Sequence, residues 1–165
     1  MNRHKSRSLL PAAIVLVTAA TTVVAAPLAD PPGDRELQRS LEAIRHVGPR
    51  GQRHAAAGKA WQRVAAARAD QLGEILRAMD GANPLATNWL RAAVDAVAER
   101  TLADKRSLPI DALEQFLFDA SHGARPRRLA FEWLVHVDPQ AADRLVPRVL
   151  DDSSLELRQE AVDAL

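Results

Sequence analysis

The sequence of 165 residues predicts an all-α fold: a right-handed α-solenoid of antiparallel helix pairs behind an N-terminal signal segment. Three observations support this prediction. Apolar residues recur at helical spacing along most of the chain. Aromatic residues make up only 4% of the chain and tyrosine is absent, which suits stacked helices better than a β-sandwich. Similar helix-pair segments also recur along the chain, as they do in solenoids.

Residues 1–26 are predicted to be a signal peptide. They begin with three basic residues, Arg3, Lys5 and Arg7. An apolar run from Leu9 to Ala26 follows, and the small residues at its end offer a cleavage site. We expect cleavage between Ala25 and Ala29, and export to the periplasm or the extracellular space. An uncleaved membrane anchor is the alternative, but the run is marginal in length for a span and contains Pro11 and three threonines.

The composition restricts the function classes. The chain carries 22 basic and 21 acidic residues, and removal of the signal peptide takes away the three basic residues named above and no acidic ones. The remaining chain is slightly acidic, which does not suggest nucleic acid as a partner. There are no cysteines, so disulfides, thiolate zinc sites and c-type haem attachment are excluded within this chain. We expect no cofactor, and no membrane contact once the signal peptide is removed.

A linker and a helical cap are expected next. Residues 27–33, PLADPPG, are predicted to form an extended linker. Residues 34–69 are predicted to form an N-terminal helical cap of two helices. The first has Asp34 as its N-cap and ends at the Gly48–Gly51 turn, and the second occupies about 55–69. The residues expected to face inward are Leu37, Leu41, Ile44, Trp61 and Val64.

Three helix pairs are predicted after the cap, over residues 70–104, 109–137 and 138–165. Asp70 is expected to cap the first helix of the first pair. The segment 80–84, DGANP, separates its two helices, because Gly81 suits a left-handed position after a helix. Asn83 is expected to cap the following helix, with Pro84 at its first position. The expected buried residues of the first two pairs are Leu72, Ile75, Leu76, Met79, Leu90, Val94, Val97, Leu102, Leu113, Phe116, Leu117, Leu129, Trp133 and Leu134.

In the third pair, Asp138 is expected to cap the first helix, and Pro147 to kink it. The turn is Asp151-Asp152. Ser153 and Glu156 have the spacing of a capping box for the second helix. The second helix is expected to bury Leu155, Leu157, Ala161, Val162 and Leu165.

This third pair resembles a HEAT repeat. Its first helix has the apolar pair and mid-helix proline of that family in Leu145-Val146-Pro147, and the acidic turn Asp151-Asp152 follows. The second helix has the apolar-Arg pair Leu157-Arg158 and then Ala161. In this family the turn Asp and the helix Arg often bond across neighbouring repeats, so the resemblance implies a structural role for Asp152 and Arg158.

An internal repeat extends the resemblance upstream. RRLAFEWL matches RQEAVDAL, so that Arg127 and Ala130 correspond to Arg158 and Ala161. The wider resemblance, over most of residues 34–165, is to bacterial secreted proteins with HEAT repeats. Such proteins tend to be long, with further repeats or β-rich domains, which implies that the repeats continue beyond the last residue. The resemblance transfers no catalytic residue to this chain.

No motif for catalysis or metal binding stands out. The five histidines are His4, His46, His54, His122 and His136. None forms HExxH or a two-histidine pair at i, i+4 spacing, so no joint metal site is expected. Asp30 and Asp151-Asp152 could suggest paired carboxylates, but an acid in a helix turn is commoner. GxSxG is absent, and the Gly48–Gly51 loop lacks the Lys-Ser/Thr of a phosphate-binding loop. The protein is therefore not expected to be an enzyme.

Two further groups of residues have a structural and a functional interpretation. One is a basic cluster, Arg50, Arg53, His54, Lys59 and Arg63. A solvated helix face is favoured for it over an anionic-ligand site. The other group is Trp61, Trp89 and Trp133, for which a place between packed helices is favoured over a platform for stacking sugars. Trp89 and Leu90 are adjacent, so they cannot face the same way.

The sequence favours a non-catalytic exported scaffold of HEAT-like pairs that binds protein through the concave face of the second helices. The alternative is an N-terminal accessory domain of a longer secreted enzyme, with the chemistry in a domain outside this sequence. A third reading, lyase chemistry on a helical-repeat scaffold as in phycobilin lyases, is not supported by the missing cysteines and sparse acids. The segment Leu155–Leu165 has no helix stop signal. Within this sequence, no further repeat is expected to cover the apolar face formed by Val149, Leu150, Leu157, Ala161 and Leu165, which predicts self-association through an open C-terminal edge.

Overall fold

A computed structural model describes residues 30–138 and 140–164, and in these residues the chain is all-helical. The helices are α1 (Asp34–Arg45), α2 (His54–Ala65), α3 (Leu72–Arg77), α4 (Pro84–Ala103), α5 (Ile110–Phe118), α6 (Ala124–Val137), α7 (Ala141–Val149) and α8 (Leu155–Asp163), with a 3₁₀ turn, η1 (Ala69–Gln71), before α3. The predicted all-α class is confirmed. The predicted signal peptide, Pro139 and Leu165 lie outside the described residues.

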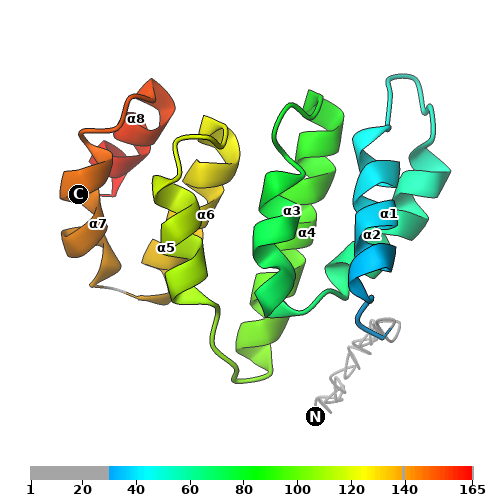
Figure 1. Cartoon of the computed structure of the whole chain (residues 1–165), viewed down its shortest axis with the longest axis horizontal. Helices are drawn as coiled ribbons and strands as arrows, with labels where there is room; N and C mark the ends of the chain where they lie inside the picture. The colour runs from blue at the N-terminus through cyan, green and yellow to red at the C-terminus, as the bar shows by residue number, and fades with distance from the viewer. Residues whose placement is uncertain (1–29, 139, 165) are drawn as a thin grey trace, which may run out of the picture.

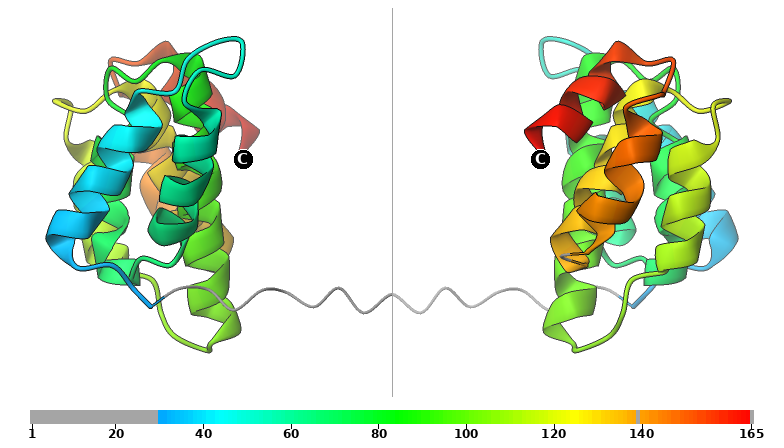
Figure 2. Two further views of the ribbon diagram at one scale, coloured as in Figure 1. Left: turned by 90° about the vertical axis from the view of Figure 1, so that its right-hand side faces the viewer. Right: turned by 90° about the vertical axis from the view of Figure 1, so that its left-hand side faces the viewer.

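The helices follow one another along the longest axis of the molecule, from α1 and α2 at one end to α7 and α8 at the other (Figure 1). Within each successive couple the two helices pack on each other, α1 on α2, α3 on α4, α5 on α6 and α7 on α8. Contacts of α2 with α4, α3 with α6, and α6 with α8 join one couple to the next. Seen from the ends, α1, α3 and α5 lie on one side, and α2, α4 and α8 on the other (Figure 2).

One apolar core extends from α1 to α8. It includes nearly all the residues that the apolar spacing predicts to be inward, among them Leu37, Ile44, Leu76, Leu90, Val97, Leu117, Leu134, Leu145 and Leu157. Burial of a leucine or valine side chain contributes roughly 1.5–3 kcal/mol relative to leaving it in water. The core therefore explains why short helices such as α3 and α5, which are marginal in isolation, persist here.

The turn between α3 and α4 forms as its residues predict. Gly81 has a left-handed backbone, with φ of +65°. The Asn83 side chain accepts a hydrogen bond of 3.0 Å from the backbone N–H of Ala86, and Pro84 is the first residue of α4. The Asn83 amide also donates to the carbonyl of Val47 at 2.9 Å, so this cap links the turn to the segment after α1.

Two predicted N-caps near the start of the chain are wrong, because their carboxylates have other partners. Gly33 is the N-cap of α1, and the Asp34 carboxylate accepts a hydrogen bond of 3.1 Å from the Gln71 side chain. Asp70 lies inside the 3₁₀ turn and pairs with Arg68 at 3.0 Å. In both cases a tertiary or neighbouring contact replaces the local cap.

Two predicted caps of the third pair are displaced along the chain. Asp138 ends α6, and its carboxylate accepts from the backbone N–H of Gln140 at 3.0 Å, so α7 begins only at Ala141. The N-cap of α8 is Ser154 and not Ser153, because the Ser154 hydroxyl accepts from the N–H of Leu157 at 3.4 Å. Local spacing allows either serine, and packing selects the second.

The apolar face predicted for α8 is only partly correct. Val149, Leu157 and Ala161 are buried, so the open C-terminal face predicted from these residues is wrong: they pack into the core. Leu155 and Val162 are 61% and 57% exposed, because they lie on the opposite side of the helix from Leu157 and Ala161. An exposed apolar strip therefore remains on α8.

Pro147 lies inside α7, on its exposed side. The helix runs without a break from Ala141 to Val149 around it. Proline cannot donate a hydrogen bond to the carbonyl of Asp143, and the burial of Leu145 and Val149 compensates for that loss.

In the part of the chain that the structure describes, every helix is too short or too polar to cross a membrane.

Candidate interaction surface

Three of the predicted repeat positions, Arg127, Asp152 and Arg158, meet where α6 approaches the loop before α8. The Arg127 guanidinium forms a bidentate ion pair with the Asp152 carboxylate. Nη1 lies 3.3 Å from Oδ1, and Nη2 is closer still to Oδ2. Arg127 Nε also donates to the carbonyl of Leu117 at 2.7 Å. Arg158 donates to the backbone carbonyl of Asp152 at 2.6 Å and not to its carboxylate. The acid in this turn thus bonds the arginine of the preceding helix couple.

This ion pair is nearly inaccessible to water, with the Arg127 and Asp152 side chains 4% and 13% exposed. Burial raises the pKa of Asp152. Hydrogen bonds from Arg127 and from the N–H of Ser154, together with the charges of Arg127 and Arg158, lower it by more, so the pKa lies below its usual value. Of the other predicted repeat positions, Ala130 and Ala161 are buried in the core, and Pro147 is exposed on α7.

Arginine side chains also cap the ends of neighbouring helices. Arg45 of α1 donates to the carbonyls of Ala78 and Asp80 after α3, at 2.6 and 2.9 Å. Arg100 of α4 donates to the carbonyls of Ala65 and Ala67 at the end of α2. These carbonyls lie at or just beyond the ends of α2 and α3, where carbonyls lack an intrahelical donor. The sequence carries no local signal for such contacts, because the donor and the acceptor lie more than thirty residues apart.

His122 joins two turns. Its Nδ1 lies 2.7 Å from Asp80 Oδ2, while the other oxygen of Asp80 accepts from the N–H of Gly123 at 2.8 Å. The His122 ring stacks on Phe116, with ring centres 4.1 Å apart. This histidine therefore has a structural role between the α3–α4 and α5–α6 turns.

The other described histidines are separate from one another. His46 bonds the carbonyl of Glu42 at 2.8 Å, and His54 and His136 each lie edge-on to a different tryptophan. Across residues 30–138 and 140–164, no three histidine or acidic side chains are grouped so as to hold a metal ion.

A line of paired charges crosses α4, α6 and α8. Arg91 of α4 bonds Glu132 of α6 at 2.5 Å. Arg128 of α6 lies 3.2 Å from Glu132 and 3.7 Å from Glu160 of α8. The hydrogen bond to Glu132 is the largest influence on Arg91 and raises its pKa. The helices of this face are thus held together at their surface by charge as well as by the core below.

A groove of about 470 Å³ runs between α4 and α6 beside these pairs. Its lining combines acidic, basic, aromatic and apolar side chains: Arg91, Asp95, Glu99, Leu102, Glu132, Trp133 and His136. The indole N–H of Trp133 donates to Asp95 at 3.0 Å, which fixes the ring across the groove. His136 lies edge-on to the same ring, with ring centres 5.2 Å apart.

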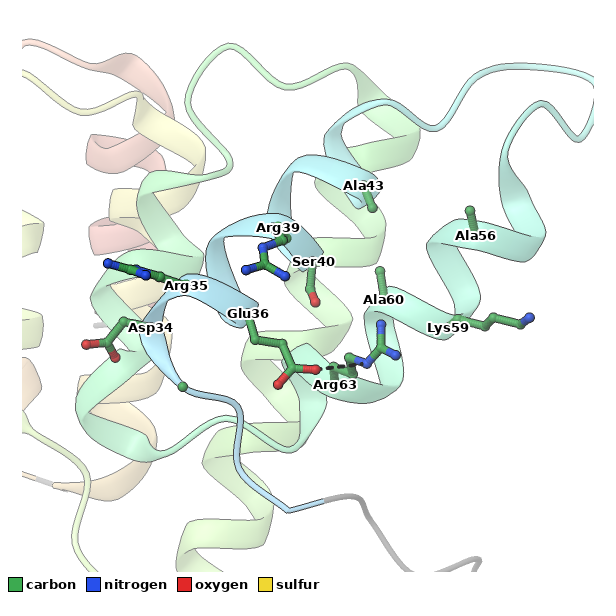
Figure 3. A pocket seen from close by; sticks show the side chains of 11 residues that line it. Asp34, Arg35, Glu36, Arg39, Ser40, Ala43, Ala56, Lys59, Ala60 and Arg63 are labelled. Carbon is green, nitrogen blue, oxygen red and sulfur yellow. Dashed lines mark ion pairs between the residues drawn. The ribbon is translucent and has the colours of Figure 1, made fainter.

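A second hollow, of about 990 Å³, lies between α1 and α2 (Figure 3). Of the predicted basic cluster, only Lys59 and Arg63 line it, together with Arg35 and Arg39 of α1. Arg63 is paired with Glu36 at 3.2 Å. The remaining members of the cluster, Arg50, Arg53 and His54, do not line this hollow.

The three tryptophans are partly buried and pack against the core, so none is a fully enclosed filler. Trp61 lies on α2 and Trp89 on α4, while Trp133 alone lines the groove between α4 and α6. The helical spacing predicts that Trp133 faces inward, but it is only partly buried because it lines the groove between α4 and α6.

No family model, curated protein or solved structure matches this chain.

Proposed function

We propose that the protein is a non-catalytic, exported scaffold built of HEAT-like helix pairs in a right-handed solenoid, and that it binds another protein through the α4/α6 groove. The main support for this proposal is the groove, in which the Trp133 ring is hydrogen-bonded to Asp95 and lies beside the other carboxylates of the lining. Aromatic side chains that are partly buried and fixed in position are frequent centres of protein interfaces.

The state of the candidate catalytic acids also supports a scaffold. Asp152 is engaged by Arg127, so its carboxylate has a structural task. Asp30 and Asp151 are exposed, and Asp151 does not share the ion pair of Asp152. A general acid or base needs a reactive partner within hydrogen-bond reach. Asp152 is instead held in a structural ion pair, and the other candidate acids are exposed to solvent.

The alternative is an N-terminal accessory domain of a longer secreted enzyme, for which the same groove would contact the catalytic domain. The two proposals differ in the origin of the partner: a separate protein in the first, and the same polypeptide in the second. The sequence of the gene downstream of Leu165 distinguishes them.

Site-specific photo-crosslinking tests the proposed role. A photoreactive phenylalanine replaces Ala92, an exposed residue on α4 one turn before Asp95, and in a matched control replaces Ala112, an exposed residue on α5. The proposal predicts a saturable adduct with one protein at Ala92 and little at Ala112. Equal labelling at both positions, or none at Ala92, would contradict it.

The proposed export is tested by determining the N-terminus of the mature protein. Mass spectrometry of the protein purified from the producing cell is expected to find a new N-terminus between Ala25 and Ala29. An intact Met1 together with membrane retention would show that the segment is an anchor instead.

A further inference from the structure

We infer that the α4/α6 groove receives an arginine or lysine side chain of the partner. The inference rests on the proposed function, because it specifies the partner's chemistry at the same groove.

The charges of the groove are unbalanced. Three carboxylates line it, against the guanidinium of Arg91. Glu132 is paired by Arg91 and also by Arg128, which lies 3.2 Å away, so the imbalance rests on Asp95 and Glu99. Arg91 is engaged by Glu132 at 2.5 Å, and it lies farther, 3.9 Å, from Asp95. The ion pairs formed by the described residues do not include Glu99, which is exposed. Its neighbour Arg100 points toward α2, where it bonds the carbonyls of Ala65 and Ala67.

Asp95 and Glu99 therefore leave negative charge in one stretch of the groove. They lie one helical turn apart on α4, a spacing at which like charges repel. A cation placed between them relieves this repulsion, and an anion would add to it. A purely apolar side chain would remove water from both carboxylates without replacing the lost hydrogen bonds.

The walls of the groove suit the rest of a basic side chain. Leu102 and the Trp133 ring offer apolar surface for the methylene stem. The Trp133 ring is held by its hydrogen bond to Asp95, so its position beside the carboxylates is fixed. A guanidinium or ammonium group is attracted to the face of an indole ring as well as to carboxylates. The groove can therefore accommodate both the methylene stem and the charged group of an arginine or lysine side chain.

The test uses the full chain and three fluorescent peptides of one sequence, Gly-Ala-Xaa-Leu-Xaa-Ala. The residue at Xaa is arginine, citrulline, which has the shape of arginine without its charge, or glutamate. We expect the arginine peptide to bind, with salt weakening it, and the citrulline and glutamate peptides to bind at least about tenfold more weakly. The indole N–H signal of Trp133 is expected to shift when the arginine peptide is added.

Two variants test the site. Glu99→Gln removes one charge from the groove without breaking an ion pair seen in the described chain, and it is expected to weaken arginine-peptide binding several-fold. Asp111→Asn makes the same charge change on the exposed side of α5 and is expected to have no effect. Circular dichroism verifies that both variants are folded.

Three results would overturn the inference: binding of the citrulline peptide as tight as that of the arginine peptide, equal loss in both variants, or no binding of the arginine peptide. A protein that crosslinks at Ala92 but binds Glu99→Gln as well as wild type also overturns it, while the proposed scaffold role stands. Peptide binding that depends on Glu99, without any protein crosslinked at Ala92, would show that the groove accepts a basic side chain and would contradict the scaffold role alone.

Discussion

Arg127 on α6 and Asp152 in the loop before α8 form an ion pair that is almost completely buried and that joins two successive helix couples. The same guanidinium caps α5 through the carbonyl of Leu117, and the same carboxylate accepts from the N–H of Ser154 before α8. One contact therefore links α6 to the end of α5 and to the loop before α8.

Removal of one partner of this pair is expected to be strongly destabilising. Arg127→Met leaves the Asp152 carboxylate buried without its cation, so the free energy of unfolding is expected to fall by about 3–5 kcal/mol. Urea denaturation measures this fall. Arg125→Met, an exposed neighbour on α6, is the control, with a change within about 0.5 kcal/mol. The double variant Arg127→Met, Asp152→Leu is expected to lose less than Arg127→Met alone, and an equal or larger loss would contradict this account.

The same pair predicts a dependence of stability on acid. The pKa of Asp152 is lower in the folded protein than the value of about 3.9 for an unfolded chain. The stabilisation from this carboxylate is therefore present above about pH 4 and is lost as the pH falls through the folded pKa. Melting temperatures from pH 7 downward are expected to decline less steeply for Asp152→Asn than for wild type. Asp119, whose pKa hydrogen bonds from Ser121 lower, still contributes a slope in the variant.

Arg158 is expected to be structural. Arg158→Ala removes a hydrogen bond to the carbonyl of Asp152 and is expected to cost about 1 kcal/mol, seen as a lower melting temperature. Partner binding by the folded variant is expected to be unchanged at saturation. Unchanged stability with lost binding would place Arg158 on the functional surface.

The apolar strip on α8 predicts self-association. Leu155 and Val162 are large and exposed, and they lie on the same side of the helix. Sedimentation velocity is expected to show an average mass that grows with concentration for wild type. Substitution of both residues by glutamate is expected to remove this growth. A wild-type monomer over the whole concentration range would refute the prediction.

Much of the fold could be predicted from the sequence, because its signals are local. The spacing of Leu37, Leu41 and Ile44 predicts a buried helix face, and these three residues are buried. The turn at Gly81 and Asn83 combines a left-handed position with a cap, and it forms as expected. Such features depend only on neighbours within one helical turn.

The surface contacts could not be predicted, because they depend on how distant helices pack. From the sequence, Arg100 is indistinguishable from a solvated arginine on α4. Its role is visible only in the fold, where the C-terminal end of α2 packs beside it and the Ala65 carbonyl accepts its hydrogen bond. Sequence repetition indicated that Arg127 and Arg158 are equivalent, and only packing shows that Asp152 bonds Arg127. The groove likewise forms only when α4 and α6 lie side by side. The spacing of Asp95 and Glu99 in the sequence therefore does not identify them as groove residues.

The central claim is that a protein partner binds at the α4/α6 groove, and one titration tests it most directly. The partner crosslinked at Ala92 is purified and titrated calorimetrically against wild type, Trp133→Leu and Phe118→Leu. Phe118 is the control because it is a partly buried aromatic residue on α5, outside the groove, with Arg148 3.6 Å above its ring. The account predicts that Trp133→Leu weakens binding at least about tenfold, as for a central interface residue, and that Phe118→Leu changes it less than about twofold. Tight binding by folded Trp133→Leu, or an equal loss in both variants, would contradict it.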